Sequence, residues 1–552
     1  MSMRRLSINP VFIALLVVVA IITCLRDSHA ADRAVTILTG NSGLASLQYE
    51  GTEFLSNGEF HIDNVVLRRW DGKSTNADVS SQITWDAAKH RITRTYSWGT
   101  ASCLYAVQGE RLDLTVDVHN TSDSIIDAVD LQLMEMKFPQ APQGWVQHYP
   151  YLSDNRGTPT AISAVFNQET MVVCNEEVGR PLLVGFPGRE SLTVRPLTIS
   201  SSAPANIFGG PSPSGAVSER PIYPGGSDSY HLSLRFGPGG ASVSGLASDV
   251  LARFATAYPP TMPNWTDRRP IGSLHLSTSE KEYHSPTNPR GWFSDPKTVD
   301  ITTPQGRESF AKRLSDYADT SIKVLKDNNA QGMIVWDLEG QEYPHATSYL
   351  GDPRSLPAEI EPLADQFFAK FKAAGLRTGL TIRPQMPVRA AYGNEVSQVE
   401  FPDIAHNLMQ KIDYAHKRWG CTLFYVDSNV NFDGRRAGND GNAYRLMDAS
   451  IFQEVAAAFP DVLLIPEHEN TRYYAYTAPY NELRQNVTGT PDSVTAVYPR
   501  AFGVIYVPDG PIDQKRDELI AAVKHGDILM FRGWWPDDYN AKVKSIYEAA
   551  KK

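Results

Sequence analysis

Cysteine is scarce in this sequence. Only four of its 552 residues are cysteines, and Cys24 lies in an N-terminal segment that we expect to be removed. The remaining three, Cys103, Cys174 and Cys421, are too few for a disulfide scaffold and lack the spacing of a metal site. Cys103 and Cys174 could form one disulfide, or both could be buried free thiols. The cysteine count therefore excludes a small fold held together by disulfides.

Long apolar runs are lacking after the N-terminus. An apolar run at residues 11–24 follows two arginines and precedes a small-residue site that ends at Ala30. This pattern predicts a signal peptide over residues 1–30, with an uncleaved anchor as the alternative and lipid attachment at Cys24 as a weaker one. No later run is long enough to cross a bilayer. We therefore expect a soluble, exported protein, periplasmic or extracellular, that is not inserted in a membrane after cleavage.

Positive charge is in short supply. The formal net charge is −10, and removal of residues 1–30 takes away three basic residues and one acidic residue, which moves it to −12. An acidic exported protein is a poor candidate for binding nucleic acid or anionic membranes. The charge balance thus argues against nucleic acid as a partner.

Residues 31–255 have the pattern of an all-β sandwich domain. Short runs of alternating apolar and polar residues are separated by turn-forming clusters, and no helical periodicity is sustained. Residues 112–139 are typical of a hairpin of two strands around a turn at Asn120. A proline-rich stretch at residues 259–263 then marks a domain junction.

Residues 265–552 alternate between strand and helix patterns. Strands are expected at residues 271–278, 333–339, 376–384, 423–429, 462–469, 494–498, 504–507 and 527–534. Helices are expected at residues 307–327, 357–374, 402–419, 443–459, 513–525 and 540–551, with a weak one at 480–486 and none between the sixth and seventh strands. Eight strands alternating with helices predict a closed (β/α)₈ barrel. An open doubly wound sheet is the alternative, although no Gly-rich turn follows the first strand.

Polar residues gather where the predicted strands end. In the clearest strand, alternation places Tyr425 and Asp427 on one face and Phe424 and Val426 on the other. The polar and aromatic residues at the strand ends are His275, Ser277, Asp337, Glu339, Arg383, Asp427, Asn429, Glu467, Glu469, Asp509, Arg532, Trp534 and Trp535. The C-terminal ends of barrel strands form the active site. Burying so many carboxylates without a function would be costly, although ion pairs with the arginines are the structural alternative.

Paired carboxylic acids beside aromatic residues favour cleavage of a glycosidic bond. One acid protonates the leaving oxygen, and the other acts as the nucleophile or as the base for water. Asp427 and a glutamate of the fifth strand can reach opposite faces of one sugar. The residues predicted to bind substrate are Asp337, Glu339, Arg383, Asn429, Tyr473, Arg532, Trp534 and Trp535. The long loop at residues 279–305 is expected to form a lid or a subsite wall.

This arrangement resembles the retaining α-glycoside hydrolases, several groups of which carry an N-terminal sandwich of the galactose-mutarotase type. In the α-amylase-like and endo-α-N-acetylgalactosaminidase-like groups, the strand-four aspartate is the nucleophile and a strand-five glutamate is the acid/base. The resemblance implies these roles for Asp427 and for Glu467 or Glu469. The α-galactosidase-like and α-glucosidase-like groups place the acid on strand six, where residues 494–500 offer no carboxylate unless Asp509 serves.

The choice between the two glutamates depends on depth. Glu467 directly follows Pro466, so it should lie deeper and nearer to Asp427, and partial burial beside a carboxylate raises the pKa of an acid. We therefore assign acid/base catalysis to Glu467 and an orienting role to Glu469. A separation of roughly 5–5.5 Å between Asp427 and Glu467 would indicate retention, and roughly 6.5–9.5 Å inversion.

Other functions fit the sequence less well. A metal-dependent amidohydrolase needs a histidine cluster, which His275 does not begin, and His468 on a strand would face away from Glu467 and Glu469. A Gly-x-Ser-x-Gly elbow on a strand-to-helix turn is missing too. No metal or cofactor is predicted. A non-catalytic carbohydrate-binding barrel stays open as the alternative function.

Overall fold

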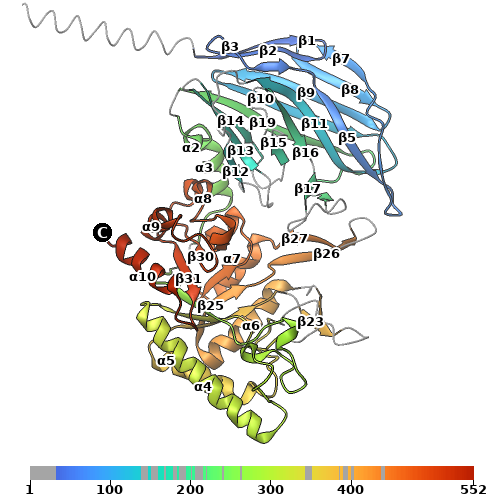
Figure 1. Ribbon diagram of the computed structural model, residues 1–552. Coiled ribbons are helices and arrows are strands. Elements are labelled where there is room, and N and C mark those ends of the chain that lie inside the picture. The colour runs from blue at the N-terminus through green and yellow to red at the C-terminus, as the bar shows by residue number, and fades with distance from the viewer. Residues whose placement is uncertain are drawn as a thin grey trace, which may run out of the picture.

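The computed structural model describes residues 33–137, 147–150, 159–166, 169–177, 183–185, 194–200, 202–204, 216–218, 220–238, 241–261, 264–341, 351–384, 386–389, 396–399, 403–436 and 442–552. These residues form an N-terminal part rich in β-sheet and a C-terminal barrel (Figure 1). The predicted signal peptide, residues 1–30, lies outside the described residues. No helix among them is long and apolar enough to cross a membrane.

The N-terminal part is a sandwich with two large sheets. One sheet has the order β12-β13-β14-β19-β10-β9-β8-β7, and the other has the order β15-β16-β11-β5-β6 with β4 beside β11. The first sheet comprises β7 (Gln82–Asp86), β8 (Arg91–Tyr96), β9 (Gly99–Gln108), β10 (Arg111–Asn120), β12 (Gln147–Pro150), β13 (Pro159–Phe166), β14 (Glu169–Asn175) and β19 (Ser227–Gly237). The second comprises β4 (Leu55–Asn57), β5 (His61–Arg68), β6 (Ser74–Asn76), β11 (Ile125–Lys137), β15 (Leu183–Gly185) and β16 (Val194–Ser200).

Smaller elements complete this domain. They are β1 (Val35–Gly40), β2 (Gly43–Tyr49), β3 (Thr52–Glu53), β17 (Ser202–Pro204), β18 (Ala216–Ser218), α2 (Val243–Leu246) and α3 (Ser248–Ala257). Alternate residues of β10, among them Leu114 and Val116, are buried in the core between the sheets. This alternation is what the sequence pattern predicts for a sheet with one face on a core.

The prediction of a hairpin at residues 112–139 is wrong. β10 and β11 belong to different sheets and do not pair with each other. The turn between them is a corner, in which the buried Asn120 Nδ2 donates to the carbonyl oxygens of Ser124 at 2.8 Å and Ile222 at 2.9 Å. These bonds fasten the corner, so the chain crosses the core instead of turning back along one sheet.

The three described cysteines are free and buried. Cys103 faces the sandwich core, whereas Cys174 packs against a different cluster that includes Phe254 of α3. Burial raises the pKa of the thiols of Cys103, Cys174 and Cys421 to about 12.

We therefore expect no thiol of the native protein to react with a disulfide reagent near neutral pH, because buried neutral thiols are poor nucleophiles. The denatured, unreduced mature protein should react with three equivalents of the reagent per chain, one for each cysteine. Titration with such a reagent before and after denaturation checks this, and a single equivalent in the denatured protein would instead show a Cys103–Cys174 disulfide.

The C-terminal part is an eight-stranded parallel barrel in the order β28-β25-β22-β21-β20-β31-β30-β29. Its strands are β20 (Ile271–Leu274), β21 (Gly332–Val335), β22 (Thr378–Ile382), β25 (Cys421–Val426), β28 (Leu463–Pro466), β29 (Tyr480–Glu482), β30 (Val504–Tyr506) and β31 (Ile528–Arg532). Between its two end strands, the amide of Ala478, just before β29, donates to the carbonyl of Leu464 on β28 at 3.0 Å. The predicted sandwich-plus-barrel fold class is thus confirmed, and an open doubly wound sheet is excluded.

Helices surround the barrel strands. They are α4 (Pro304–Asp327), α5 (Glu361–Ala373), α6 (Ile404–Trp419), α7 (Ala449–Ala458), α8 (Asp492–Val497), α9 (Arg516–His525) and α10 (Asp538–Ala550). Their ends follow local rules: Thr303 and Asp403 cap α4 and α6, and Gly420 ends α6 in the left-handed conformation. Two hairpins leave the barrel, β23 (Met386–Arg389) with β24 (Val396–Val399) and β26 (Val430–Arg436) with β27 (Asn442–Leu446).

The sixth barrel strand differs from the prediction. It is β29, where a weak helix was expected, whereas most of the predicted strand at residues 494–498 belongs to α8 (Asp492–Val497). Val494, Val497 and Tyr498 are buried at helical spacing, so packing outweighs the strand preference of valine. The barrel therefore has a short sixth helix, and the sixth strand ends at Glu482.

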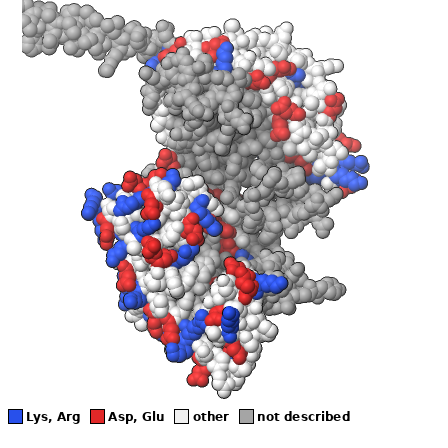
Figure 2. Space-filling view, viewed as in Figure 1, with Lys and Arg blue, Asp and Glu red and all other residues white. Residues whose placement is uncertain are grey.

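Among the described residues, the two domains touch beside α8 and beside β27. α3 lies beside α8 (Figure 1), where the Tyr498 hydroxyl donates to the carbonyl of Tyr258 at 2.8 Å. The hairpin β17–β18 of the sandwich lies beside β27, and β27 belongs to the segment that follows β25. On the barrel face shown in Figure 2, acidic and basic side chains are interspersed.

Candidate active site

Asp427 directly follows β25 at the C-terminal end of the barrel. Leu423 and Tyr425 lie in the barrel interior and Phe424 and Val426 on the helix side, so the predicted alternation is confirmed. The Asp427 amide donates to the carbonyl of Ile382 at 2.9 Å, which continues the ladder to β22. The side chain is 9% exposed, and Arg383 Nε donates to its Oδ2. Asp427 is thus a nearly buried carboxylate held by a guanidinium.

Glu467 directly follows β28, the neighbouring strand, and contacts Asp427. The carboxyl of Glu467 forms a hydrogen bond with that of Asp427. Burial, followed by the negative charge of Asp427, raises the pKa of Glu467 to about 8. Glu467 therefore keeps its proton at neutral pH. The separation between the two carboxyls that would indicate retention or inversion stays a prediction.

Backbone geometry supports this pair. Ser428 has a left-handed φ of 52°, which is uncommon for a residue other than glycine. In this conformation its amide donates to Glu467 Oε2 at 2.7 Å. The Glu467 amide in turn donates to the carbonyl of Val426 at 3.0 Å. The turn after β25 thus binds the Glu467 side chain directly, which fits the strain often found at functional sites.

The expectation that His468 faces away from the glutamates is wrong. β28 ends at Pro466, so strand alternation does not extend to the residues after it. His468 Nε2 lies 3.4 Å from Glu467 Oε2. Among the described residues, no group of three or more His, Cys, Asp or Glu side chains is arranged to hold a metal ion.

Glu469 is directed toward β29. Its Oε2 accepts hydrogen bonds from the Tyr474 hydroxyl at 2.6 Å and from Asn481 Nδ2 at 3.2 Å. Neutral donors that hold a carboxylate in place are consistent with the orienting role that the sequence predicts for Glu469.

The barrel mouth also contains Glu482, which the sequence reasoning missed. It ends β29, and its Oε1 accepts a hydrogen bond at 3.0 Å from Tyr480, whose ring lies in the barrel interior. Its side chain is 13% exposed and is paired with Arg484. Because the sixth strand was predicted at residues 494–498, Glu482 was not expected at the end of a strand. The single signal for it was the short run after Pro479, in which Tyr480 and Glu482 share a face.

Aromatic rings form the floor of the mouth. Trp336 lies 4.3 Å from Tyr425 and 5.5 Å from His275, and His275 lies 4.9 Å from Trp534, measured between ring centroids. Burial lowers the pKa of His275, so its ring is neutral near pH 7. Tyr480 packs against Tyr425 at 5.0 Å. The floor suits the apolar faces of a sugar.

Three predicted substrate-binding residues are buried and hydrogen-bonded within the protein. Asp337 is fully buried, and its carboxylate accepts bonds from Leu276, Ser277 and Gln341. Asn429 is fully buried and exchanges two hydrogen bonds with the backbone of His468. Tyr473 packs on Phe452 and donates to the carbonyl of Met447. Each of these polar groups already has partners within the protein.

Arg383 stands in a buried polar network behind the site. Lys411 is fully buried, and its Nζ donates to the carbonyl of Arg383 at 2.6 Å. Burial lowers the pKa of Lys411 to about 8. Asp352 lies 4.0 Å from Lys411 Nζ, and its amide donates to Glu339 Oε1 at 2.7 Å. Glu339 is therefore linked to Arg383 and supports the site from behind.

Replacing Glu339 with glutamine should make stability less dependent on pH. Burial raises the pKa of Glu339 from 4.5 to about 7. Its contribution to the free energy of unfolding is complete below pH 4.5 and is lost as pH rises through about 7. The reason is that, in this range, the folded protein holds a proton that the unfolded chain has released. We expect the fall in Tm between about pH 5 and about pH 8 to be smaller in the variant.

Thermal unfolding across this pH range checks the result. The exposed Glu361, paired with Arg418, supplies a matched control, Glu361→Gln. An unchanged slope in Glu339→Gln would contradict the role of burial at this position.

Arg532, Trp534 and Trp535 lie at the end of β31. Arg532 Nη2 is paired with Asp509 Oδ2 at 2.5 Å. Trp534 and Trp535 line a cavity of about 490 Å³ beside the mouth, and Trp535 is 62% exposed. The predicted aromatic residues of strand eight thus face open space.

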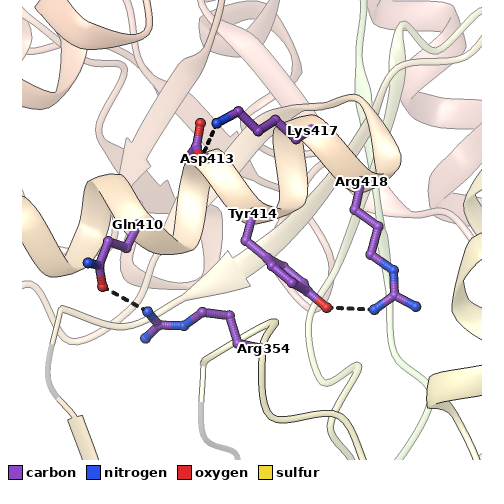
Figure 3. A pocket seen from close by; sticks show the side chains of 6 residues that line it. All are labelled: Arg354, Gln410, Asp413, Tyr414, Lys417 and Arg418. Carbon is purple, nitrogen blue, oxygen red and sulfur yellow. Dashed lines mark hydrogen bonds and ion pairs between the residues drawn. The ribbon is translucent and has the colours of Figure 1, made fainter.

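Two other cavities are unrelated to the strand ends. A groove on the outer face of α6 is lined by Arg354, Gln410, Asp413, Tyr414, Lys417 and Arg418. Figure 3 shows these side chains hydrogen-bonded in pairs, Arg354 with Gln410, Lys417 with Asp413 and Arg418 with Tyr414. A cavity of about 690 Å³ lies at the opposite end of the barrel, beside Pro270 and Asn329, which precede β20 and β21. Neither cavity contains a predicted site residue.

No protein-family model and no curated protein matches this sequence. Solved structures that are similar to this chain include glycoside hydrolases. The GH36 α-galactosidase AgaA of Geobacillus stearothermophilus is 11% identical, with 94% of this chain and 85% of that chain covered and a TM-score of 0.41. The α-galactosidase of Lactobacillus brevis is 10% identical, with 94% and 72% covered and a TM-score of 0.39.

A GH31 sulfoquinovosidase from E. rectale is also similar. It is 10% identical, with 94% of this chain and 82% of that chain covered and a TM-score of 0.43.

Proposed function

We propose that this protein is an exported glycoside hydrolase that cleaves α-linked oligo- or polysaccharides or glycoconjugates with retention of configuration. The observation that carries the proposal is the contact between Asp427 and Glu467 at the barrel mouth. Arg383 favours the ionised form of Asp427, while Glu467 keeps its proton to about pH 8. An ionised carboxylate beside a protonated one is the combination that glycosidic bond cleavage requires.

The two groups divide the reaction between them. Glu467 donates its proton to the glycosidic oxygen as the bond to the anomeric carbon breaks, and Asp427 attacks that carbon to form a glycosyl ester. Glu467, now ionised, takes a proton from water, which attacks the anomeric carbon and releases Asp427. Glu469, held by Tyr474 and Asn481, orients the substrate.

Glu467 must turn away from Asp427 for a sugar to lie between them. Its side chain is 28% exposed, so it has space toward the solvent. Glu482 is the competing acid, because it faces the mouth from β29, with β28 between it and Asp427 in chain order. Its position matches the strand-six acid of the α-galactosidase-like groups.

Hydrolysis of a panel of aryl α- and β-glycosides and polysaccharides tests the function. We expect turnover of at least one α-glycoside, with the α-anomer as the first product in an NMR time course. Binding without turnover would favour the alternative, a non-catalytic carbohydrate-binding barrel. Export is proposed from residues 1–30, and a mature N-terminus at Ala31 in the secreted protein tests it.

A further inference from the structure

A cavity lies beside the barrel mouth and outside the pair of catalytic carboxyls. It occupies about 490 Å³ between α4 and the loops that follow β20 and β31. Its aromatic wall consists of Phe293, Tyr317, Trp534 and Trp535, and Asp316 and Thr320 of α4 add polar groups. Phe293 belongs to the loop at residues 279–305, which the sequence predicts to form a lid or a subsite wall.

A row of rings joins this cavity to the nucleophile. Trp534 lines the cavity and contacts His275, His275 is stacked on Trp336, and Trp336 packs on Tyr425. Tyr425 is two residues before Asp427 and shares its inward face. The rings therefore form a continuous row of contacts between the strand that precedes Asp427 and the cavity.

The cavity wall has features that packing does not require. Trp535 is the one large hydrophobic side chain of the described barrel residues that is mostly exposed. Phe293 and Ser294 both have left-handed φ angles, 55° and 51°, which are unfavourable for residues with a side chain. Arg313 lies 4.8 Å above the Phe293 ring and is paired with Asp295 at 2.7 Å, which holds that ring against the cavity.

We propose that this cavity binds a neutral sugar unit of the substrate chain, several sugar units away from the bond that is cleaved. The substrate is then an oligo- or polysaccharide and not a single sugar on a small group. Rings offer their faces to the C–H surface of a pyranose, while Asp316 and Thr320 meet its hydroxyls. This inference rests on the proposed function, and it adds that the substrate is a chain of several sugar units.

Chain-length dependence of the kinetics tests the proposal. The probes are a p-nitrophenyl α-glycoside and α-linked oligosaccharides of increasing length built from the same sugar. For the wild-type protein, kcat/KM should rise with length. Trp535→Ala removes the exposed ring, and Thr320→Trp fills the cavity from α4. Each should reduce the gain from chain length by about three- to tenfold, mainly through KM.

Trp70→Ala is the matched control, since Trp70 is 71% exposed but lies on the sandwich. It should leave the gain from chain length unchanged. If the wild-type protein cleaves the probes but both cavity variants keep the full gain, the subsite is overturned while the function stands. Equal losses on short and long probes also overturn it. If the wild-type protein cleaves neither class of probe, the proposed function fails, and this inference fails with it.

Discussion

Replacing Asp427 with asparagine is expected to lower the rate of glycoside hydrolysis by about 10³-fold or more. The amide can still accept the hydrogen bond from Arg383, but it cannot attack the anomeric carbon. The variant should therefore fold, with circular dichroism and Tm close to those of the wild-type protein. Measurement of kcat on the best aryl glycoside, together with Tm, separates loss of chemistry from loss of structure.

Asp413→Asn is a matched control, because Asp413 pairs with Lys417 on the outer face of α6, away from the strand ends. It should keep wild-type activity. Near-normal turnover by Asp427→Asn would show that another group is the nucleophile, and exogenous formate should partly restore activity in Asp427→Gly if the assignment is right.

Removing Glu467 should produce the second largest effect. Loss of a general acid lowers kcat by about 10²–10⁴-fold on substrates with poor leaving groups. On an activated aryl glycoside the first step needs no acid, so azide should restore turnover of Glu467→Ala and yield a glycosyl azide of retained configuration. Glu482→Ala, treated in the same way, is the comparison that decides between the two acids.

The pH profile gives an independent measurement. Glu467 must carry its proton to act, so wild-type activity should fall as pH rises through about 8, the pKa of this carboxyl. The variant Glu467→Ala should lack this alkaline limb while Glu482→Ala keeps it. If Glu482→Ala is rescued by azide and lacks the alkaline limb, while Glu467→Ala shows neither effect, then Glu482 on strand six is the acid.

The sequence by itself determined the parts of the site that depend on local regularity. Alternation along one strand places Leu423, Tyr425 and Asp427 on one face, and the structure confirms that Leu423 and Tyr425 line the barrel interior. The repeated change between strand and helix patterns predicted the parallel barrel. Neighbouring parallel strands bring their carboxyl ends together, so the proximity of Asp427 and Glu467 followed from strand order.

Only the tertiary structure decided the sixth strand. β29 has three residues, which is too few for alternation to be recognised. The valines of α8 favour a strand locally, but burial of Val494 and Val497 against the core makes them helical. Glu482 was therefore missed, because its position at a strand end depends on the barrel around it.

Tertiary structure also decided the electrostatics of the site. The pKa of Glu467 depends on burial and on Asp427, which is distant in sequence. The hydrogen bonds to Asp337 come largely from the end of β20, and they occupy a carboxylate that sequence alone presents as available. Local patterns fix which way a side chain points along a strand, whereas its solvent exposure and its partners come from segments that only folding brings together.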